Sequence, residues 1–136
     1  HIYCVMCREQ IALSFNGGKD CTVILHLLRV YSAVSQQGTD NVCRRIKYVH
    51  FVKDNEFEEI KSFREAIEQA YGIQVQLYSA DFKGEVQRLI DEQGVKAIIM
   101  GNRRTDPYSA ELTAICKSSP GWPEFTRVFP ILDWGY

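Results

Sequence analysis

The sequence lacks the features that place a protein in or across a membrane. No apolar run approaches the roughly 20 residues that a membrane-spanning helix needs. The opening residues, His1-Ile2-Tyr3, do not form the charged segment and long apolar core of a signal peptide. We therefore expect a cytoplasmic protein with no membrane partner; a mitochondrial form that has lost its presequence is the alternative.

The sequence also lacks an excess of positive charge. Its 136 residues include 16 Lys and Arg and 17 Asp and Glu, which gives a formal net charge of -1. Proteins that bind nucleic acid through their overall field are basic, so we expect no nucleic-acid partner. Anions must be bound locally, by particular loops, and we expect small-molecule substrates and a monomer.

The cysteines do not form the spacing of a disulfide framework or of a complete zinc site. The chain has five cysteines, an odd number at irregular spacing, which favours reduced thiols. Cys4 and Cys7 form a CxxC pair, but no second CxxC or paired histidine follows to complete a tetrahedral site. The protein ligand of any metal stays unknown at this stage.

Length and composition indicate one folded domain. Hydrophobic residues make up 46% and charged residues 24% of the chain, which is typical of a globular protein. The chain does not begin with Met and stops abruptly at Tyr136. We therefore interpret residues 1–136 as a single domain that is truncated at its C-terminal end.

Strand-like and helix-like apolar patterns alternate along the chain. They predict strands at residues 10–15, 46–52, 73–79, 95–101 and 127–132, and a loop between the last two. Helices are predicted to begin at residues 19, 57 and 82 and to end before Ser35, Gly72 and Gly94. The predicted apolar face of the first helix consists of Val23, Ile24, Leu27, Leu28 and Tyr31, and that of the second of Phe57, Ile60, Phe63, Ile67 and Tyr71. This alternation predicts an α/β fold with three layers, α/β/α, around a mostly parallel sheet.

The chemically unusual segments follow three of the predicted strands. They are residues 14–20, 52–56 and 101–109. In parallel α/β sheets, ligands bind at the carboxyl ends of the strands. We therefore expect these three segments to form one site.

The first of these segments, "SFNGGKD", has the composition of a phosphate-binding loop. Gly17 and Gly18 allow a sharp turn that brings backbone N–H groups close to an anion, and the start of a helix adds positive potential. Lys19 adds a full positive charge. The adjacent glycines and the Asp20 after the lysine exclude the Walker pattern and the dinucleotide pattern. A simple glycine turn with incidental charges is the alternative.

The third segment, "MGNRRTDPYS", combines arginines with an aspartate beside a proline. The guanidinium groups of Arg103 and Arg104 suit a phosphate group, and Asp106 could accept a hydrogen bond from a ring N–H. Farther on, Trp122 lies near Arg127 in the sequence and indicates either loop packing or a platform for a planar ligand. A solvated loop with chance charges is the alternative.

The phosphate loop resembles the S-G-G-x-D-[ST] loop of the PP-loop ATP pyrophosphatases, the adenine nucleotide alpha hydrolase-like fold. Here Asn16 lies between the serine and the glycines, and Cys21 stands where Ser or Thr is common. The resemblance implies cleavage of ATP between the α- and β-phosphates, with the loop holding the departing pyrophosphate. Donors on the leaving group would stabilise its growing charge.

Four motifs together resemble the eukaryotic FAD synthase family of the PAPS reductase-like group: "SFNGGKDC", "GNRRTDPYS", "GWPEFTR" and "FPILDWGY". The resemblance covers essentially the whole chain. It implies an FMN adenylyltransferase that uses ATP, FMN and Mg²⁺ and forms FAD and pyrophosphate. Family members continue past the last motif with an arm that carries further arginines, and this arm is missing here.

The resemblance also implies roles for individual residues. The implied catalytic residues are Asn16, Lys19, Asp20 and Asp106. The implied ATP-binding residues are Ser14, Phe15, Asn16, Gly17, Gly18, Lys19, Asp20, Val52, Gly101 and Asn102, and the implied flavin-binding residues are Arg103, Arg104, Asp106, Ser119, Trp122 and Arg127. Either Asp20 or Asp106 could hold Mg²⁺, and the sequence does not choose between them.

Two other functions are compatible with the same loop. A sulfonucleotide (PAPS) reductase needs a nucleophilic cysteine, and neither Cys4 nor Cys116 lies in a recognisable motif for one. A non-catalytic module that binds ATP or flavin is the second alternative. A tRNA-thiolating enzyme is disfavoured by the lack of a basic surface and of paired CxxC sites.

Overall fold

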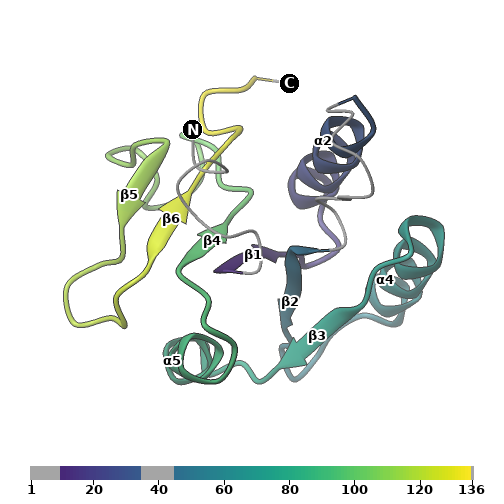
Figure 1. Cartoon of the computed structure of the whole chain (residues 1–136), viewed down its shortest axis with the longest axis horizontal. Helices are drawn as coiled ribbons and strands as arrows, with labels where there is room; N and C mark the ends of the chain where they lie inside the picture. The colour runs from purple at the N-terminus through teal and green to yellow at the C-terminus, as the bar shows by residue number, and fades with distance from the viewer. Residues whose placement is uncertain (1–9, 35–44, 136) are drawn as a thin grey trace.

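The computed structural model describes residues 10–34 and 45–135, which form one six-stranded sheet with helices on both faces (Figure 1). The strand order is β3-β2-β1-β4-β6-β5. The strands are β1 (Ile11–Ser14), β2 (Lys47–Phe51), β3 (Val75–Tyr78), β4 (Ala97–Ile99), β5 (Ile115–Lys117) and β6 (Thr126–Val128). The helices are α2 (Lys19–Val34), α4 (Glu58–Tyr71) and α5 (Phe82–Gln93). The CxxC pair lies outside the described residues.

The sheet is parallel except at one edge. The pairs β1–β2, β1–β4, β2–β3 and β4–β6 are parallel, and only β5 runs antiparallel to its neighbour β6. The predicted three-layer α/β/α fold with a mostly parallel sheet is therefore confirmed. None of the described helices is both long and apolar enough to cross a membrane.

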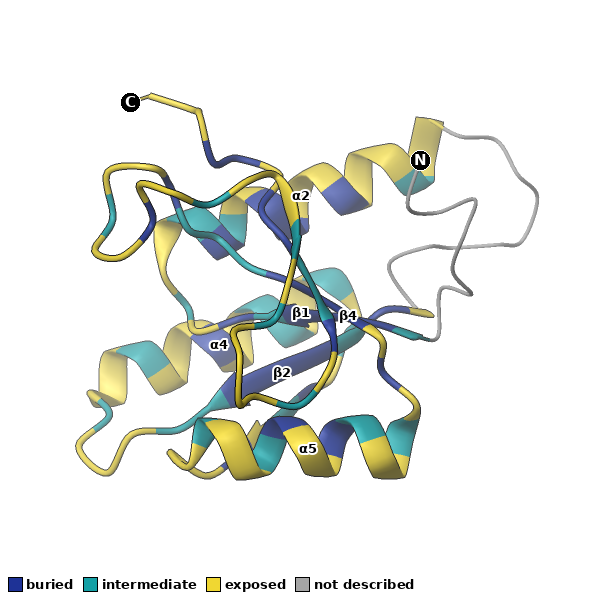
Figure 2. Cartoon of the chain, turned by 90° about the vertical axis from the view of Figure 1, so that its left-hand side faces the viewer, coloured by how far each residue is buried: buried dark blue, intermediate teal, exposed yellow. Residues whose placement is uncertain are grey.

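Each face of the sheet has its own apolar core. On one face, Ile11 and Leu13 of β1 pack with Leu25 of α2, and Ile67 of α4 packs against the same cluster. On the other face, Ala12 of β1 belongs to a second apolar cluster with Val86 and Leu89 of α5. This division follows from the alternation of side chains along a strand. Figure 2 shows the buried residues enclosed between the layers and exposed residues along the outer side of α5.

The buried face of α2 differs from the predicted one. The residues that pack on the sheet are Cys21, Ile24, Leu25 and Leu28, whereas Val23, Leu27 and Tyr31 are about 40% exposed. Apolar residues lie almost all round this helix, so their spacing alone does not select a face. In α4 the only buried residue is Arg64, and Phe57 is 72% exposed.

The region after β4 contains a strand that the sequence does not predict. Residues 102–126 were expected to be a loop, yet Ile115–Lys117 form β5 at the sheet edge. The strand is three residues long and Ile115 is exposed, so it has no clear apolar pattern. The strand expected at residues 127–132 is instead Thr126–Val128, followed by a turn at Pro130, which has no N–H to donate to a sheet.

Candidate active site

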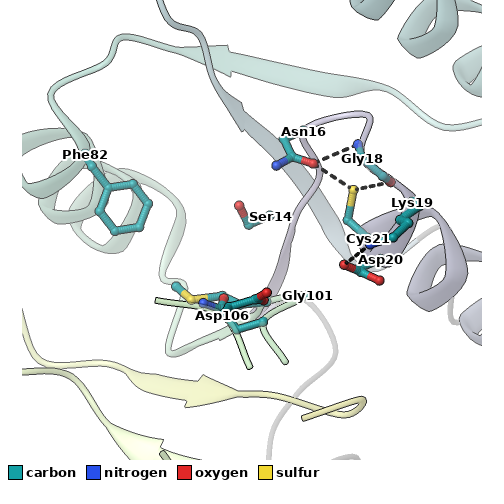
Figure 3. A pocket seen from close by; sticks show the side chains of 11 residues that line it. Ser14, Asn16, Gly18, Lys19, Asp20, Cys21, Phe82, Gly101 and Asp106 are labelled. Carbon is teal, nitrogen blue, oxygen red and sulfur yellow. Dashed lines mark hydrogen bonds and ion pairs between the residues drawn. The ribbon is translucent and has the colours of Figure 1, made fainter. Parts of the chain in front are cut away.

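The carboxyl ends of β1, β2 and β4 lie side by side because these strands are parallel neighbours. The chain builds outward from β1 in one direction to β2 and β3, and then crosses to β4 on the other side. Such a switch point opens a crevice at the ends of the strands. A cavity of about 510 Å³ lies there, between the phosphate loop and the segment after β4 (Figure 3).

The phosphate loop forms one wall of this cavity and is ordered by its own side chains. The Gly18 N–H donates to Asn16 Oδ1 at 2.9 Å, and Gly17 has a φ of 81°, which favours glycine. The Cys21 thiol lies 3.1 Å from Asn16 Oδ1 and 3.2 Å from the Gly18 carbonyl oxygen, and burial raises its pKa. Asn16 thus fixes the shape of the turn. Helix α2 begins at Lys19, so its first N–H groups face the cavity end of the loop.

Gly101, at the end of β4, forms part of the opposite wall and lies against the start of α2. A Cβ atom at this position would be 3.1 Å from the Cys21 backbone nitrogen and 3.3 Å from the Asp20 carbonyl carbon. Backbone atoms cannot move aside as a flexible side chain can. A Cβ here would force these backbone atoms to shift by a few tenths of an ångström, so the close contact between the two segments favours a glycine at residue 101.

Arg103 connects the two walls instead of projecting into the cavity. It is only 6% exposed, and its Nε lies 3.4 Å from Asp20 Oδ1. Asp20 Oδ2 also lies 3.2 Å from Lys19 Nζ. The backbone N–H of Arg103 donates to Asp106 Oδ2 at 2.7 Å, so the aspartate side chain closes the turn that carries the arginine. Asp20 and Asp106 both line the cavity.

Arg104, which was expected to contact flavin, holds together segments outside the cavity wall. It forms an ion pair with Asp133, and its Nη1 donates to the carbonyl oxygens of Ala110 and Leu112 at 3.0 Å each. The ion pair raises the pKa of Arg104 and lowers that of Asp133, chiefly through their hydrogen bond. The Arg104 guanidinium therefore contacts the loop at residues 110–112 and the Asp133 side chain, and Arg104 is not among the residues that line the cavity.

Trp122 reaches the site through an aromatic neighbour. Its ring centroid lies 5.4 Å from that of Phe82, which itself lines the cavity, and Lys83 Nζ lies 5.9 Å from the indole. Ser119 is exposed, and its carbonyl oxygen accepts the Trp122 N–H at 3.1 Å. Arg127 Nε donates to the Lys117 carbonyl oxygen at 3.1 Å, which places this arginine on the β5–β6 pair.

A second cavity of about 420 Å³ continues the first one past Ser14, Asn16 and Phe82. Its walls are largely aromatic and aliphatic, with Phe51, Phe57, Ile60 and Phe82, and they also include His50, Lys53, Asn55 and Glu56. Val52, the residue predicted at this position, uses its N–H in a bond to the Tyr78 carbonyl oxygen, and its neighbours line the cavity. Sequence reasoning missed Phe82 and His50, because a residue of an apolar pattern carries no sign that it faces a ligand.

Within the described residues, no group of three or more His, Cys, Asp and Glu side chains is arranged to hold a metal ion. The carboxylates that line the first cavity are Asp20 and Asp106. Two carboxylates together with phosphate oxygens of a substrate form the usual environment of Mg²⁺. The cavity therefore suits a metal that arrives with a phosphorylated substrate.

Comparison with known families identifies the domain. The phosphoadenosine phosphosulfate reductase domain family matches residues 10–86 and 83–136, which together include all the described strands and helices. The chain belongs to this family. The phosphate loop, the segment after β4 and the β5–β6 pair described above all lie within the matched residues.

Three proteins that match this chain are named as FAD synthases or as an FMN adenylyltransferase. The chain is 37% identical over 94% of its length to a probable FAD synthase of Caenorhabditis briggsae and 34% identical over 94% to one of Schizosaccharomyces pombe. It covers 24% and 49% of those proteins, a quarter to a half of their length. A crystal structure of Candida glabrata FMN adenylyltransferase, in complex with FAD and inorganic pyrophosphate, matches 93% of the chain with a TM-score of 0.80 and 28% identity, and the chain covers 45% of it.

Proposed function

We propose that the protein transfers AMP from ATP to FMN, forming FAD and releasing pyrophosphate. The observation that carries this proposal is the cavity between the ordered phosphate loop and Asp106, which provides an anion site on one wall and a carboxylate on the other. The similarity to an FMN adenylyltransferase that holds FAD and pyrophosphate supports this choice among reactions that split ATP.

The phosphate loop would bind the β- and γ-phosphates. The backbone N–H groups at the start of α2 and the ammonium of Lys19 would donate to this group while the α–β bond breaks. Charge grows on the departing pyrophosphate in the transition state, so these donors act where they stabilise the reaction most. Asn16 contributes by fixing the turn, through its bond from the Gly18 N–H.

The adenine would occupy the second cavity, beyond Ser14 and Asn16. Its walls at Phe51, Phe57 and Ile60 offer the apolar surfaces that a planar base needs. The two cavities share Ser14, Asn16 and Phe82, so one extended ligand can span both. The α-phosphate would then lie near the shared residues.

The FMN phosphate would attack the α-phosphorus in line with the departing pyrophosphate. This nucleophile is already anionic, so no general base is required, and catalysis comes from positioning and from neutralisation of charge. FMN would approach past Asp106, which lines the first cavity, and past Phe82, which lines it too and contacts Trp122. The contacts of Arg103 and Arg104 favour supporting roles for them, through Asp20 and the loop respectively.

Asp20 and Asp106 are the residues that would hold Mg²⁺ together with phosphate oxygens. When bound, this ion neutralises charge on the phosphates. With Mg²⁺ bound, Arg103 would keep both carboxylates in orientation. Its guanidinium contacts the Asp20 side chain, and its backbone N–H donates to the Asp106 side chain.

The test is to incubate the full-length protein with ATP, Mg²⁺ and FMN and to separate the flavins by chromatography. We expect FAD and pyrophosphate in equal amounts. Thiol-dependent release of sulfite from phosphoadenosine phosphosulfate would instead show a reductase. Binding of ATP and FMN with no FAD formed would show a non-catalytic module.

A further inference from the structure

Three charged or polar side chains form a largely buried cluster at the wall of the second cavity, which His50 and Glu56 line. They are His50 at the end of β2, Glu56 after it, and Arg64 in the second turn of α4. Arg64 Nη1 lies 3.0 and 3.1 Å from the two carboxylate oxygens of Glu56, and His50 Nε2 contacts Oε1 of the same group. His50 is 6% and Arg64 5% exposed. None of the motifs of the phosphate loop or of the segment after β4 includes these residues.

The hydrogen-bonding roles in the cluster follow from chemistry. A carboxylate only accepts hydrogen bonds, so the His50 Nε2–H donates to Glu56. His50 Nδ1 is then buried, and it has no hydrogen-bond partner among the described residues. A buried ion pair contributes little net stability compared with apolar packing, and a buried polar atom without a partner has a cost. Stability alone therefore does not explain the cluster.

The cluster instead fixes the path of the chain between β2 and α4. The segment leaves the sheet at Val52, turns at residues 54–55 and returns at Glu56, whose carboxylate contacts both flanking elements. The side chains of Lys53, Asn55 and Phe57, which lie on this segment, line the second cavity. The start of α4 has no side-chain cap, because the side chain of Phe57 at the N-cap position cannot accept a hydrogen bond.

We infer that Glu56 is a positioning residue for the nucleobase end of ATP, held by Arg64 and His50 so that residues 53–57 form the wall of the base cavity. The inference rests on the proposed function, because it takes ATP as the ligand that spans the two cavities. Glu56 acts through the segment, and the phosphate loop binds the triphosphate independently of it.

The experiment compares a ligand that has a base with one that has none. In the full-length protein, dissociation constants are measured by calorimetry for ATP and for inorganic tripolyphosphate, in the Glu56→Gln variant and in a Glu59→Gln control. Glu59 is an exposed residue in the first turn of the same helix. We expect Glu56→Gln to weaken ATP binding about tenfold, since a small displacement of a site wall has an effect of this order, and to leave tripolyphosphate binding unchanged. The control changes neither.

Two further variants separate positioning from a loss of folding. Glu56→Gln leaves the buried Arg64 charge without its carboxylate, so the double variant Glu56→Gln/Arg64→Gln, which removes both charges, is measured as well. We expect it to weaken ATP binding as the single variant does. His50→Leu removes the N–H donor to Glu56 and should weaken ATP binding as Glu56→Gln does, with tripolyphosphate binding unchanged.

The results that would overturn the inference are specific. One is unchanged ATP affinity in Glu56→Gln or in the folded double variant. Another is equal weakening of ATP and tripolyphosphate, which would place the effect at the phosphate loop, where Ile60 of α4 lies close to Gly17. Failure of the proposed function is a separate outcome, because a wild type that binds ATP but forms no FAD still allows the two affinities to be compared.

Discussion

Asp106 offers a sharp test of the proposed reaction, because its two possible functions can be separated by two variants. Its Oδ2 accepts the Arg103 N–H at 2.7 Å, and its own N–H donates to the Arg103 carbonyl oxygen at 2.9 Å. Asn at residue 106 keeps an oxygen that can accept from Arg103 and removes only the charge. Ala removes the acceptor as well, and the turn then loses its side-chain bond.

The expected magnitudes follow from these contacts. The lost bond to a carboxylate should lower the free energy of unfolding of Asp106→Ala by about 1–2 kcal/mol, and Asp106→Asn by less than about 1 kcal/mol. If the charge of Asp106 acts on the reacting phosphates by holding Mg²⁺, both variants should lose about 100-fold in kcat/KM for FMN, the usual effect of removing one electrostatic group from a site. The dissociation constant of ATP should change by less than about threefold in both, because the phosphate loop is intact.

The assay is continuous detection of pyrophosphate with FMN as the varied substrate, together with urea denaturation of each variant. Asp91→Asn serves as the control, because Asp91 is an exposed residue on α5 whose side chain accepts a hydrogen bond from Gln87. Normal turnover by Asp106→Asn would refute the proposed role of the charge. If Asp106→Asn turns over normally and Asp106→Ala loses turnover, the function of Asp106 is to hold the turn alone.

Three further predictions test the supporting structure. Gly101→Ala should weaken binding of tripolyphosphate and ATP alike, measured by calorimetry, because its Cβ would lie 3.1 Å from the Cys21 backbone nitrogen at the start of α2. Arg104→Ala should make the loop at residues 110–112 more sensitive to limited proteolysis while ATP affinity stays the same, because its side chain bonds Ala110 and Leu112 outside the cavity wall. The third concerns pH: burial alone raises the pKa of Glu56, but the hydrogen bonds from its two partners outweigh burial and hold the pKa below its ordinary value of 4.5. A lowered pKa stabilises the folded state above the ordinary value, and this stability is lost as the pH falls through the lowered pKa. The difference in unfolding free energy between wild type and Glu56→Gln should therefore be constant near neutral pH and narrow below pH 4.5, as measured by urea denaturation; a difference that widens in acid would contradict it.

The order of strands and helices could be predicted because its signals are local. An apolar run, two glycines and an amphipathic segment indicate β1, the phosphate loop and α2 without reference to the rest of the chain. The place of the site follows in turn from the parallel sheet. The buried face of α2 could not be predicted in the same way, because Val23 and Leu27 are as apolar as Leu25 and only the packing on the sheet distinguishes them.

The arginines show why residue type at a motif does not determine a role. A guanidinium fork suits a carboxylate as well as a phosphate, so the sequence "RRTDP" is compatible with either partner. The choice depends on what the fold brings near: Arg103 lies against Asp20, and Arg104 against Asp133. Both partners are far away in the sequence. These two side chains are therefore already engaged by protein carboxylates, and an incoming phosphate would have to displace one of them or be bound by other groups.

The same reasoning separates the two ends of the cavity. At the phosphate end, the groups that would contact ligand are backbone N–H groups and Lys19, which a short motif can specify. At the base end, the wall consists of Phe51, Phe57 and Ile60, and its shape depends on the Glu56 contacts with two different elements. A relative could therefore keep the phosphate motif unchanged and bind a different base by changing residues 50–64. Exchanging that segment between two such proteins should transfer the preference for the base and leave tripolyphosphate affinity with the host, and transfer of both together would show that the two ends do not act independently.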